Sequence, residues 1–126
     1  MLRQKIGKQI EKNVIKSFLM ANVPLKKSVE LDHNHKIDFI LFFENQKCGI
    51  QFSLRKDSIK AKIAKTCALD VVSRFIYLTL SKNFFDKPDK KNGMDLYRLL
   101  GIVFQSYPQK ALWVNIDMKG MNVKAI

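Results

Sequence analysis

Two apolar runs on either side of a short polar break constrain the fold of this chain more than any other feature of its sequence. The segment KIDFILFFENQKCGIQFSLRKD covers residues 36–57, and its two runs are residues 36–43 and 48–55. Aromatic and β-branched residues favour strands, and the polar letters ENQK between the runs are typical of a turn. Both faces of the resulting pair are largely apolar, as in strands that are covered on both sides. We therefore expect an antiparallel hairpin in the middle of a sheet.

Three polar side chains interrupt these runs, and they are Asp38, Gln51 and Ser53. Opposed residues of an antiparallel pair point to the same face, so the expected hairpin gathers all three on one side. A buried carboxylate is costly unless it is paired or binds a cation. Asp38 is therefore either a cap at the start of its strand or part of a site. A four-residue loop or a two-residue loop at Asn45-Gln46 gives the same register. This expected register pairs Phe43 with Cys48, Ile40 with Gln51 and Asp38 with Ser53.

The remaining segments predict further helices and strands around the hairpin. Residues 3–22 have apolar side chains at helical spacing, with lysines on the opposite face. After the hairpin, Asp57 or Ser58 is a candidate N-cap for a helix that carries Ile59 and Ile63 on its apolar stripe. Alanines in this helix permit close packing, and they are Ala61, Ala64 and Ala68. The other expected elements are strands at 27–32, 74–80 and 111–116, a lysine-rich loop at 81–93 and a helix at 94–106.

The order of the expected elements is α-β-β-β-α-β-α-β. Such an order implies an α/β fold with a mixed sheet and helices packed on it. A length of 126 residues and a hydrophobic fraction of 47% fit a single domain over residues 1–126. We expect its core at 3–80, a helix–strand extension at 92–117 and a frayed tail after Asp117.

An excess of basic residues indicates a polyanionic partner. The chain has 23 Lys and Arg residues against 11 Asp and Glu residues, which gives a net charge of +12. Nucleic acid and anionic membrane surfaces attract such a charge, and a lysine coat that only keeps the protein in solution is the alternative. Most of these residues are Lys, which favours attraction to the phosphate backbone over the reading of base edges.

The sequence predicts a cytoplasmic protein with no membrane partner. Its N-terminal segment carries charges throughout and lacks the uninterrupted apolar region of a signal peptide. Uncharged runs elsewhere are far shorter than a membrane span. Cys48 and Cys67 are expected to be buried reduced thiols, as in a cytosolic protein.

The order of elements and the place of the polar residues together resemble the PD-(D/E)XK nuclease superfamily, the fold of restriction endonucleases and archaeal Holliday-junction resolvases. The core of that superfamily has the order α-β-β-β-α-β. The first acid of its motif lies on the second strand, the (D/E)-X-K half lies on the third strand, and a Glu on the first helix often joins the site. The resemblance covers residues 3–80 and implies a restriction-endonuclease-like core with an added helix and strand.

Residue by residue, the resemblance assigns a site to this chain. Asp38 stands where the first acid would be, and Gln51 and Ser53 stand where the second acid and the lysine would be. The implied ligands of Mg²⁺ or Mn²⁺ are Glu11, Asp38 and the side-chain oxygen of Gln51. The chain departs from the pattern at Ser53, because the family's lysine orients or activates the attacking water. Some members carry this lysine on the following helix, where Lys60 is the candidate.

Basic residues near the expected site and in the lysine-rich loop are the predicted nucleic-acid contacts. Each of them also has a simpler interpretation as solvated surface charge. Phe84 and Phe85 in the same loop are candidates for stacking on unpaired bases, unless they only pin the loop to the core. The predicted nucleic-acid contacts are Arg55, Lys56, Lys60, Lys62, Lys87, Lys90 and Lys91.

Three functions follow from these patterns as alternatives. The first is a magnesium-dependent endonuclease that hydrolyses DNA phosphodiester bonds, and the retained Asp38 and Glu11 favour it. The second is a nucleic-acid-binding module on the same fold with a degenerate site, acting as a homodimer or as a subunit of a larger complex. The third is an interaction or structural protein whose lysines are incidental.

Overall fold

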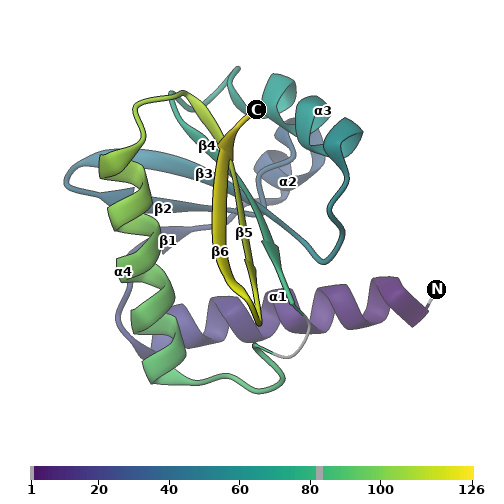
Figure 1. Cartoon of the computed structure of the whole chain (residues 1–126), viewed down its shortest axis with the longest axis vertical. Coiled ribbons are helices and arrows are strands. Elements are labelled where there is room, and N and C mark those ends of the chain that lie inside the picture. The colour runs from purple at the N-terminus through teal and green to yellow at the C-terminus, as the bar shows by residue number, and fades with distance from the viewer. Residues whose placement is uncertain (1, 82–83) are drawn as a thin grey trace.

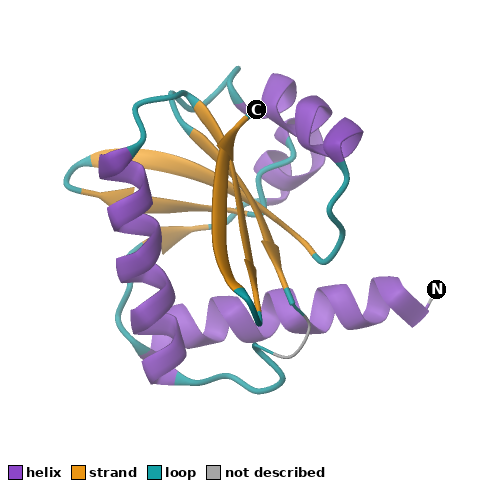
Figure 2. Cartoon of the chain, viewed as in Figure 1, coloured by secondary structure: helices purple, strands orange, loops and turns teal. Residues whose placement is uncertain are grey.

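A computed structural model describes residues 2–81 and 84–126 of the chain. Helices and strands alternate along most of the chain. The strands form one central sheet, and the helices pack on it (Figures 1 and 2). The elements are α1 (Leu2–Met20), β1 (Leu25–Lys26), α2 (Val29–His35), β2 (Phe39–Phe43), β3 (Gln46–Ser53), α3 (Ser58–Ala68), β4 (Phe75–Leu80), α4 (Lys90–Ser106), β5 (Ala111–Asp117) and β6 (Gly120–Ala125).

The six strands form one mixed sheet, in the order β1-β2-β3-β4-β5-β6. Strands β1, β2 and β3 are antiparallel neighbours, and β6 runs antiparallel to β5. Strands β3, β4 and β5 are parallel. Parallel neighbours need a crossover connection, and α3 and α4 provide the two that this sheet requires. The predicted mixed sheet with packed helices is therefore confirmed.

Helices cover both faces of the sheet, as the apolar character of the hairpin predicted. Val14 and Phe18 of α1 pack with Leu100 of α4 and with Phe39 and other strand residues in one core cluster. Alanines of α3 pack in a second cluster that contains Ile40, the neighbour of Phe39 in β2. Because successive side chains of a strand point to opposite faces, the two clusters lie on the two sides of the sheet.

The turn of the hairpin is shorter than the predicted four-residue loop and lies one residue earlier than the predicted two-residue loop. Glu44 and Asn45 form it, and both have positive φ angles, 47° and 68°. Two such residues are typical of a type I′ turn, whose twist matches that of the flanking strands. As a result Phe43 pairs with Gln46, not with Cys48, and the predicted register was wrong by two residues.

A shift of two residues keeps the paired side chains of β2 and β3 on their expected faces but changes their partners. Before the first pair the alternation breaks, because Ile37 packs in the same cluster as Ile40 and Phe39 packs in the other cluster. Ile40 pairs with Gly49 instead of Gln51. The last pair of the ladder is Phe39 with Ile50, so Asp38 and Gln51 follow it on either strand. The backbone N–H of Asp38 donates to the carbonyl oxygen of Ile50, so Asp38 still lies opposite Ile50 at the end of the hairpin, whereas the predicted register placed it opposite Ser53.

The segment that was predicted as a strand at 27–32 is mostly helical. β1 is only two residues long, and α2 follows it directly. The Ser28 side chain accepts the backbone N–H of Leu31 at 3.1 Å and so caps the first turn of α2. Lys36 ends the helix in the left-handed conformation, with φ of 56°, and turns the chain toward β2.

The helix after the hairpin has its predicted N-cap but a different buried face. Asp57 Oδ1 accepts the backbone N–H groups of Ile59 and Lys60 at 3.0 and 3.1 Å. Ile59 and Ile63, predicted for the buried stripe, are 70% and 54% exposed. The buried residues are alanines, whose small side chains allow α3 to lie close to the sheet. These alanines are Ala61, Ala64 and Ala68.

The C-terminal tail is a strand, so the prediction that it frays after Asp117 was wrong. Asp117 Oδ1 accepts the backbone N–H of Lys119 at 2.9 Å, and Gly120 has a φ of 130° in the following turn. This turn folds β6 back along β5 at the edge of the sheet (Figure 1). The preceding helix is also longer than predicted, because α4 begins at Lys90 with Asp89 as its N-cap.

Candidate functional site

Asp38 is fixed by the backbone of the neighbouring strand. Its own N–H donates to the carbonyl oxygen of Ile50 at 2.8 Å. Its Oδ2 atom accepts the backbone N–H of Phe52 at 2.7 Å. With only 6% of its surface exposed, this carboxyl group lies at the end of the hairpin and has little contact with solvent. It is therefore a buried acid in a defined position, not a mobile cap at the rim.

Two more acids act on this buried group. Burial raises the pKa of Asp38 most, and the Glu11 carboxylate and a hydrogen bond to the Asp32 carboxyl raise it further, to about 8. The N–H of Phe52 has the opposite effect on this pKa but is outweighed. Like charges this close disfavour each other's ionised form unless a cation lies between them. The surroundings of Asp38 therefore favour a proton or a bound cation.

Gln51 contributes an oxygen without a partner. Its Oε1 atom is buried and accepts no hydrogen bond within the described residues. Buried polar atoms in native proteins are nearly always satisfied, so such an exception indicates a missing donor or ion. Gln51 follows Ile50, the last residue of β3 that pairs with β2, and pairs with Tyr77 of β4. An amide oxygen is also a ligand that Mg²⁺ and Mn²⁺ accept.

A row of polar side chains on the neighbouring strands contrasts with Gln51. Thr79 of β4 pairs with Ser53 of β3 in the sheet register, and Asn115 of β5 pairs with Thr79. Thr79 Oγ1 donates to Asn115 Oδ1 at 2.6 Å and accepts Trp113 Nε1–H at 3.0 Å. These groups satisfy one another, and the row therefore has a structural explanation that Gln51 lacks.

Glu11 extends the site toward α1. The residue is half-buried, and its Oε2 atom lies 3.5 Å from the Nζ atom of Lys27. Lys27 lies between β1 and α2 and was not among the predicted site residues. It is a cation that contacts one of the acids near Asp38.

Ser53 does not replace the family's lysine chemically. It is buried, and its hydroxyl oxygen accepts the backbone N–H of Arg55 at 3.1 Å. The alternative candidate, Lys60, is an exposed residue in the first turn of α3. The Nζ atom of Lys56 lies 3.7 Å from the carboxylate of Asp117, at the C-terminal end of β5, and the two groups form an ion pair. The described residues of the hairpin and α3 thus bring no lysine to Asp38.

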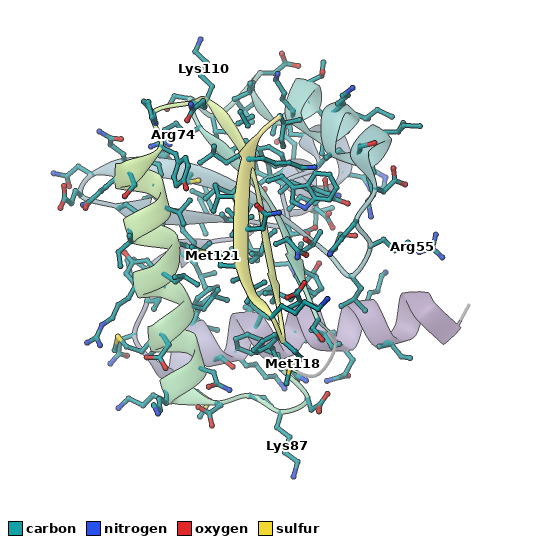
Figure 3. The ribbon with its side chains drawn as sticks, in the orientation of Figure 1. Arg55, Arg74, Lys87, Lys110, Met118 and Met121 are labelled. Carbon is teal, nitrogen blue, oxygen red and sulfur yellow. The ribbon has the colours of Figure 1, made fainter. Side chains whose placement is uncertain are left out.

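The predicted nucleic-acid contacts are all exposed, but they are not gathered in one patch. Figure 3 shows Arg55 and Lys87 pointing into solvent on different sides of the molecule. Lys90 and Lys91 lie at the start of α4 and line a surface depression that also contains Asp89 and Asp95. The other three, Lys56, Lys60 and Lys62, belong to α3 or the segment before it.

The aromatic pair of the lysine-rich loop is explained by packing. Phe85 is buried, and Phe84 packs against the same core cluster. Asn13 of α1 holds this loop, because its Nδ2 group donates to the carbonyl oxygens of Phe85 and Asp86 at 2.8 and 3.1 Å. The stacking role considered for the two phenylalanines is therefore not available to Phe85.

The two thiols are separate from the site. Both are free, as predicted, but only Cys48 is buried and Cys67 is half-buried. Loss of solvation raises the pKa of the Cys48 thiol to about 12, against the opposing effect of Arg74. A thiol with so high a pKa is not a nucleophile at neutral pH.

Asp32 and Lys27 are the residues near the site that sequence reasoning missed. The prediction of a strand at 27–32 hid both of them. A helical signal was present, since Ser28 is a favoured N-cap residue and Glu30 and Asp32 are acids in the first turn of α2. Among the described residues, no three His, Cys, Asp or Glu side chains are gathered closely enough to hold a metal ion by themselves.

Comparisons with protein-family models, with curated proteins and with solved structures find no match to this chain. None of the helices in residues 2–81 and 84–126 is both long and apolar enough to span a bilayer. The interpretation of the site therefore depends on its own geometry and on the resemblance in its motif.

Proposed function

We propose that this chain is a metal-dependent nuclease of the PD-(D/E)XK type that hydrolyses DNA. The observation that carries the proposal is the buried Asp38 carboxyl group at the end of the hairpin, which lies near the carboxyl groups of Glu11 and Asp32. Such a group of hard oxygen atoms is suited to Mg²⁺ or Mn²⁺. A cation would also relieve the repulsion between the acids.

The arrangement of the elements supports the proposal. A helix precedes an antiparallel β1-β2-β3 unit, and α3 then connects β3 to the parallel strand β4. This is the α-β-β-β-α-β order of the superfamily, with α2 as an addition between its first two strands. Asp38 immediately precedes the second strand and Gln51 lies on the third, close to the positions of the motif. The net charge of +12 supports a polyanionic substrate.

In this proposal, each residue has a distinct task in hydrolysis. Asp38 holds the metal ion, oriented by its hydrogen bond from Phe52, while Glu11 and Gln51 supply further oxygen ligands. When bound, Mg²⁺ or Mn²⁺ would polarise the scissile phosphate and lower the pKa of a water molecule. The exposed lysines of α3 would attract the phosphate backbone of the substrate.

A nuclease assay tests the proposal directly. Plasmid and single-stranded DNA are incubated with the protein, with and without Mg²⁺ or Mn²⁺. We expect cleavage that requires the metal and that is lost in Asp38→Ala but kept in Asp70→Ala, which removes an exposed acid at the end of α3. Absence of metal-dependent cleavage, or equal cleavage by Asp38→Ala, would contradict the nuclease function.

Ser53 favours a second candidate function, a nucleic-acid-binding module that no longer cleaves. The hydroxyl of Ser53 already accepts a backbone hydrogen bond and offers no positive charge. A gel-shift experiment distinguishes this function, since backbone binding weakens steeply as salt increases. Salt-dependent binding without cleavage would support the module, and no binding at low salt would exclude both candidates.

A further inference from the structure

The outer face of α1 carries three exposed lysines in a line. Lys8, Lys12 and Lys16 lie four residues apart, so their side chains share one face of the helix. We call these three residues the lysine row. Val14 and Phe18 on the opposite side of α1 are fully buried in the core. The lysine row therefore faces away from the body of the protein and toward solvent.

No acid compensates the charge of the lysine row. Glu11 is the one acid of α1, and its carboxylate contacts Lys27 at 3.5 Å. Among the described residues, the only other ion pair joins Lys56 to Asp117. Like charges four residues apart destabilise a helix, so the lysine row has a cost that no ion pair offsets. Its uncompensated charge is available to a polyanion.

The exposed surface of α4 differs from that of α1 in this respect. Asp95 lies four residues after Lys91 and three residues before Arg98, and all three are exposed. Interspersed charges of both signs are typical of a surface that only keeps a protein in solution. A row with charges of one sign is instead typical of a surface that binds nucleic acid.

The packing of α1 fixes the lysine row on the body of the protein. Near its C-terminal end, Ser17 Oγ accepts the backbone N–H of Asp89 at 2.9 Å. At its N-terminal end, a Cβ atom at Gly7 would lie 3.9 Å from the side chain of Leu54, the residue before Arg55. Figure 3 shows Arg55 pointing into solvent on the side where the N-terminal half of α1 lies. The lysine row thus ends near a residue that was predicted to contact nucleic acid.

The length of the lysine row fits a short stretch of nucleic-acid backbone. A rise of about 1.5 Å per residue gives about 12 Å from Lys8 to Lys16. Phosphates of one strand follow each other at about 3.4 Å along the duplex axis, so the row spans about three or four of them. We propose that the lysine row binds the phosphate backbone of the DNA substrate and leads it toward Arg55. This assignment rests on the proposed function for the identity of the polyanion, but it concerns binding and not cleavage.

The experiment measures binding of a fluorescein-labelled DNA duplex to the full chain by fluorescence anisotropy, over a series of salt concentrations. EDTA is present, so that metal-dependent cleavage does not interfere. The row variant is Lys12→Gln with Lys16→Gln. The control is Lys47→Gln with Lys110→Gln, which removes the same charge from exposed lysines of β3 and of the loop before β5. Figure 3 shows Lys110 at the opposite end of the molecule from α1.

We expect the row variant to bind DNA about tenfold more weakly at low salt. The slope of log Kd against log salt concentration should fall by about two, one for each phosphate contact that is lost. The control should change this slope by less than about 0.5. The Tm of the row variant should equal or exceed that of the wild type, because removing like charges four residues apart stabilises a helix. Weaker binding is then not a result of unfolding.

The outcomes separate this assignment from the nuclease proposal. Binding that depends on the lysine row without any metal-dependent cleavage would support the assignment and contradict the nuclease. Metal-dependent cleavage by the wild type together with an unchanged slope in the row variant would overturn the assignment and leave the nuclease standing. An equal fall of the slope in the control would also overturn it, because net charge alone would then explain binding. Wild-type protein that binds vesicles of anionic lipid but no DNA would overturn it as well.

Discussion

The Oδ2 atom of Asp38 accepts the backbone N–H of Phe52 at 2.7 Å, although burial and two neighbouring acids disfavour its charge. One backbone hydrogen bond thus holds the Asp38 carboxylate at a position where a neutral side chain would make the folded protein more stable. This combination is typical of functional sites, where stability is lower than the fold alone would allow.

Replacing Asp38 by Asn should stabilise the metal-free protein at high pH. The pKa of Asp38 is raised from 3.8 to about 8, so the folded state binds more protons than the unfolded state between these values. The stability of the wild type should therefore fall as pH rises from about 4 to about 8, and Asp38→Asn should remove this fall. At pH 8.5 the gain should be about 2–5 kcal/mol in urea unfolding with EDTA. An equal gain at pH 5 and pH 8.5 would contradict the assignment.

Gly93→Ala should strongly destabilise the packing of α4 on α1. A Cβ atom at Gly93 would lie 2.2 Å from the carbonyl oxygen of Ser17, which cannot move without displacing α1. We expect a loss of about 2 kcal/mol or more in the free energy of unfolding. Gly101 is the matched control in the same helix, since its Cβ would meet only the Phe43 ring at 3.4 Å. Gly101→Ala should be neutral or stabilising, and similar losses in both variants would contradict this explanation.

Asn13→Ala should loosen the connection between β4 and α4. The Asn13 side chain donates to the backbone of Phe85 and Asp86, and its removal leaves these carbonyl oxygens without that donor. We expect a loss of about 1–3 kcal/mol in chemical denaturation. Lys12→Ala, which changes an exposed neighbour on α1, should have little effect. A loss for Lys12→Ala as large as that for Asn13→Ala would point to helix propensity instead.

An Asn-Gly sequence in the hairpin turn should stabilise the protein. Glu44 and Asn45 both have positive φ angles, which Glu adopts at a cost and which Asn and Gly adopt readily. The double variant Glu44→Asn, Asn45→Gly should raise the free energy of unfolding by about 0.5–1 kcal/mol. Glu44→Gln, which has no such preference, should leave it unchanged, and a gain there would contradict the backbone explanation.

Lys27→Met should lower cleavage if the nuclease proposal is correct. The Lys27 ammonium lies 3.5 Å from the carboxylate of Glu11, one of the acids that act on Asp38. Loss of such a supporting contact reduces activity by about tenfold or more. Lys26→Met is the control, because Lys26 is an exposed neighbour at the end of β1. Equal rates in the two variants, measured with plasmid DNA and Mg²⁺, would contradict a role for Lys27.

Sequence patterns alone determined most of the sheet. The apolar runs at 36–43 and 48–55 became β2 and β3, and the strands predicted at 74–80 and 111–116 became β4 and β5. These predictions succeeded because a strand buried on both faces needs a continuous apolar run, which is visible without knowledge of its neighbours. The prediction that Asp57 is an N-cap was also correct, because capping depends on adjacent residues.

Tertiary structure decided the details that make the site. The hairpin register depended on the backbone angles of Glu44 and Asn45, for which the sequence had no Asn-Gly signal. The buried face of α3 depended on how closely the helix approaches the sheet, which selected alanines over the larger Ile59 and Ile63. The hairpin register and the buried face of α3 both depend on packing between segments, which the local sequence does not show.

The acids around Asp38 also divide into those that the sequence revealed and one that only the tertiary structure revealed. Asp38, Gln51 and Glu11 could be selected from the sequence, because polar residues at buried positions stand out against an apolar pattern. Asp32 could not, since it joins the group only through the fold of α2 back onto the start of β2. The sequence by itself thus determined which strands form and which polar residues they carry. Only the tertiary structure decided which acids meet, because that depends on contacts between α1, α2 and the hairpin.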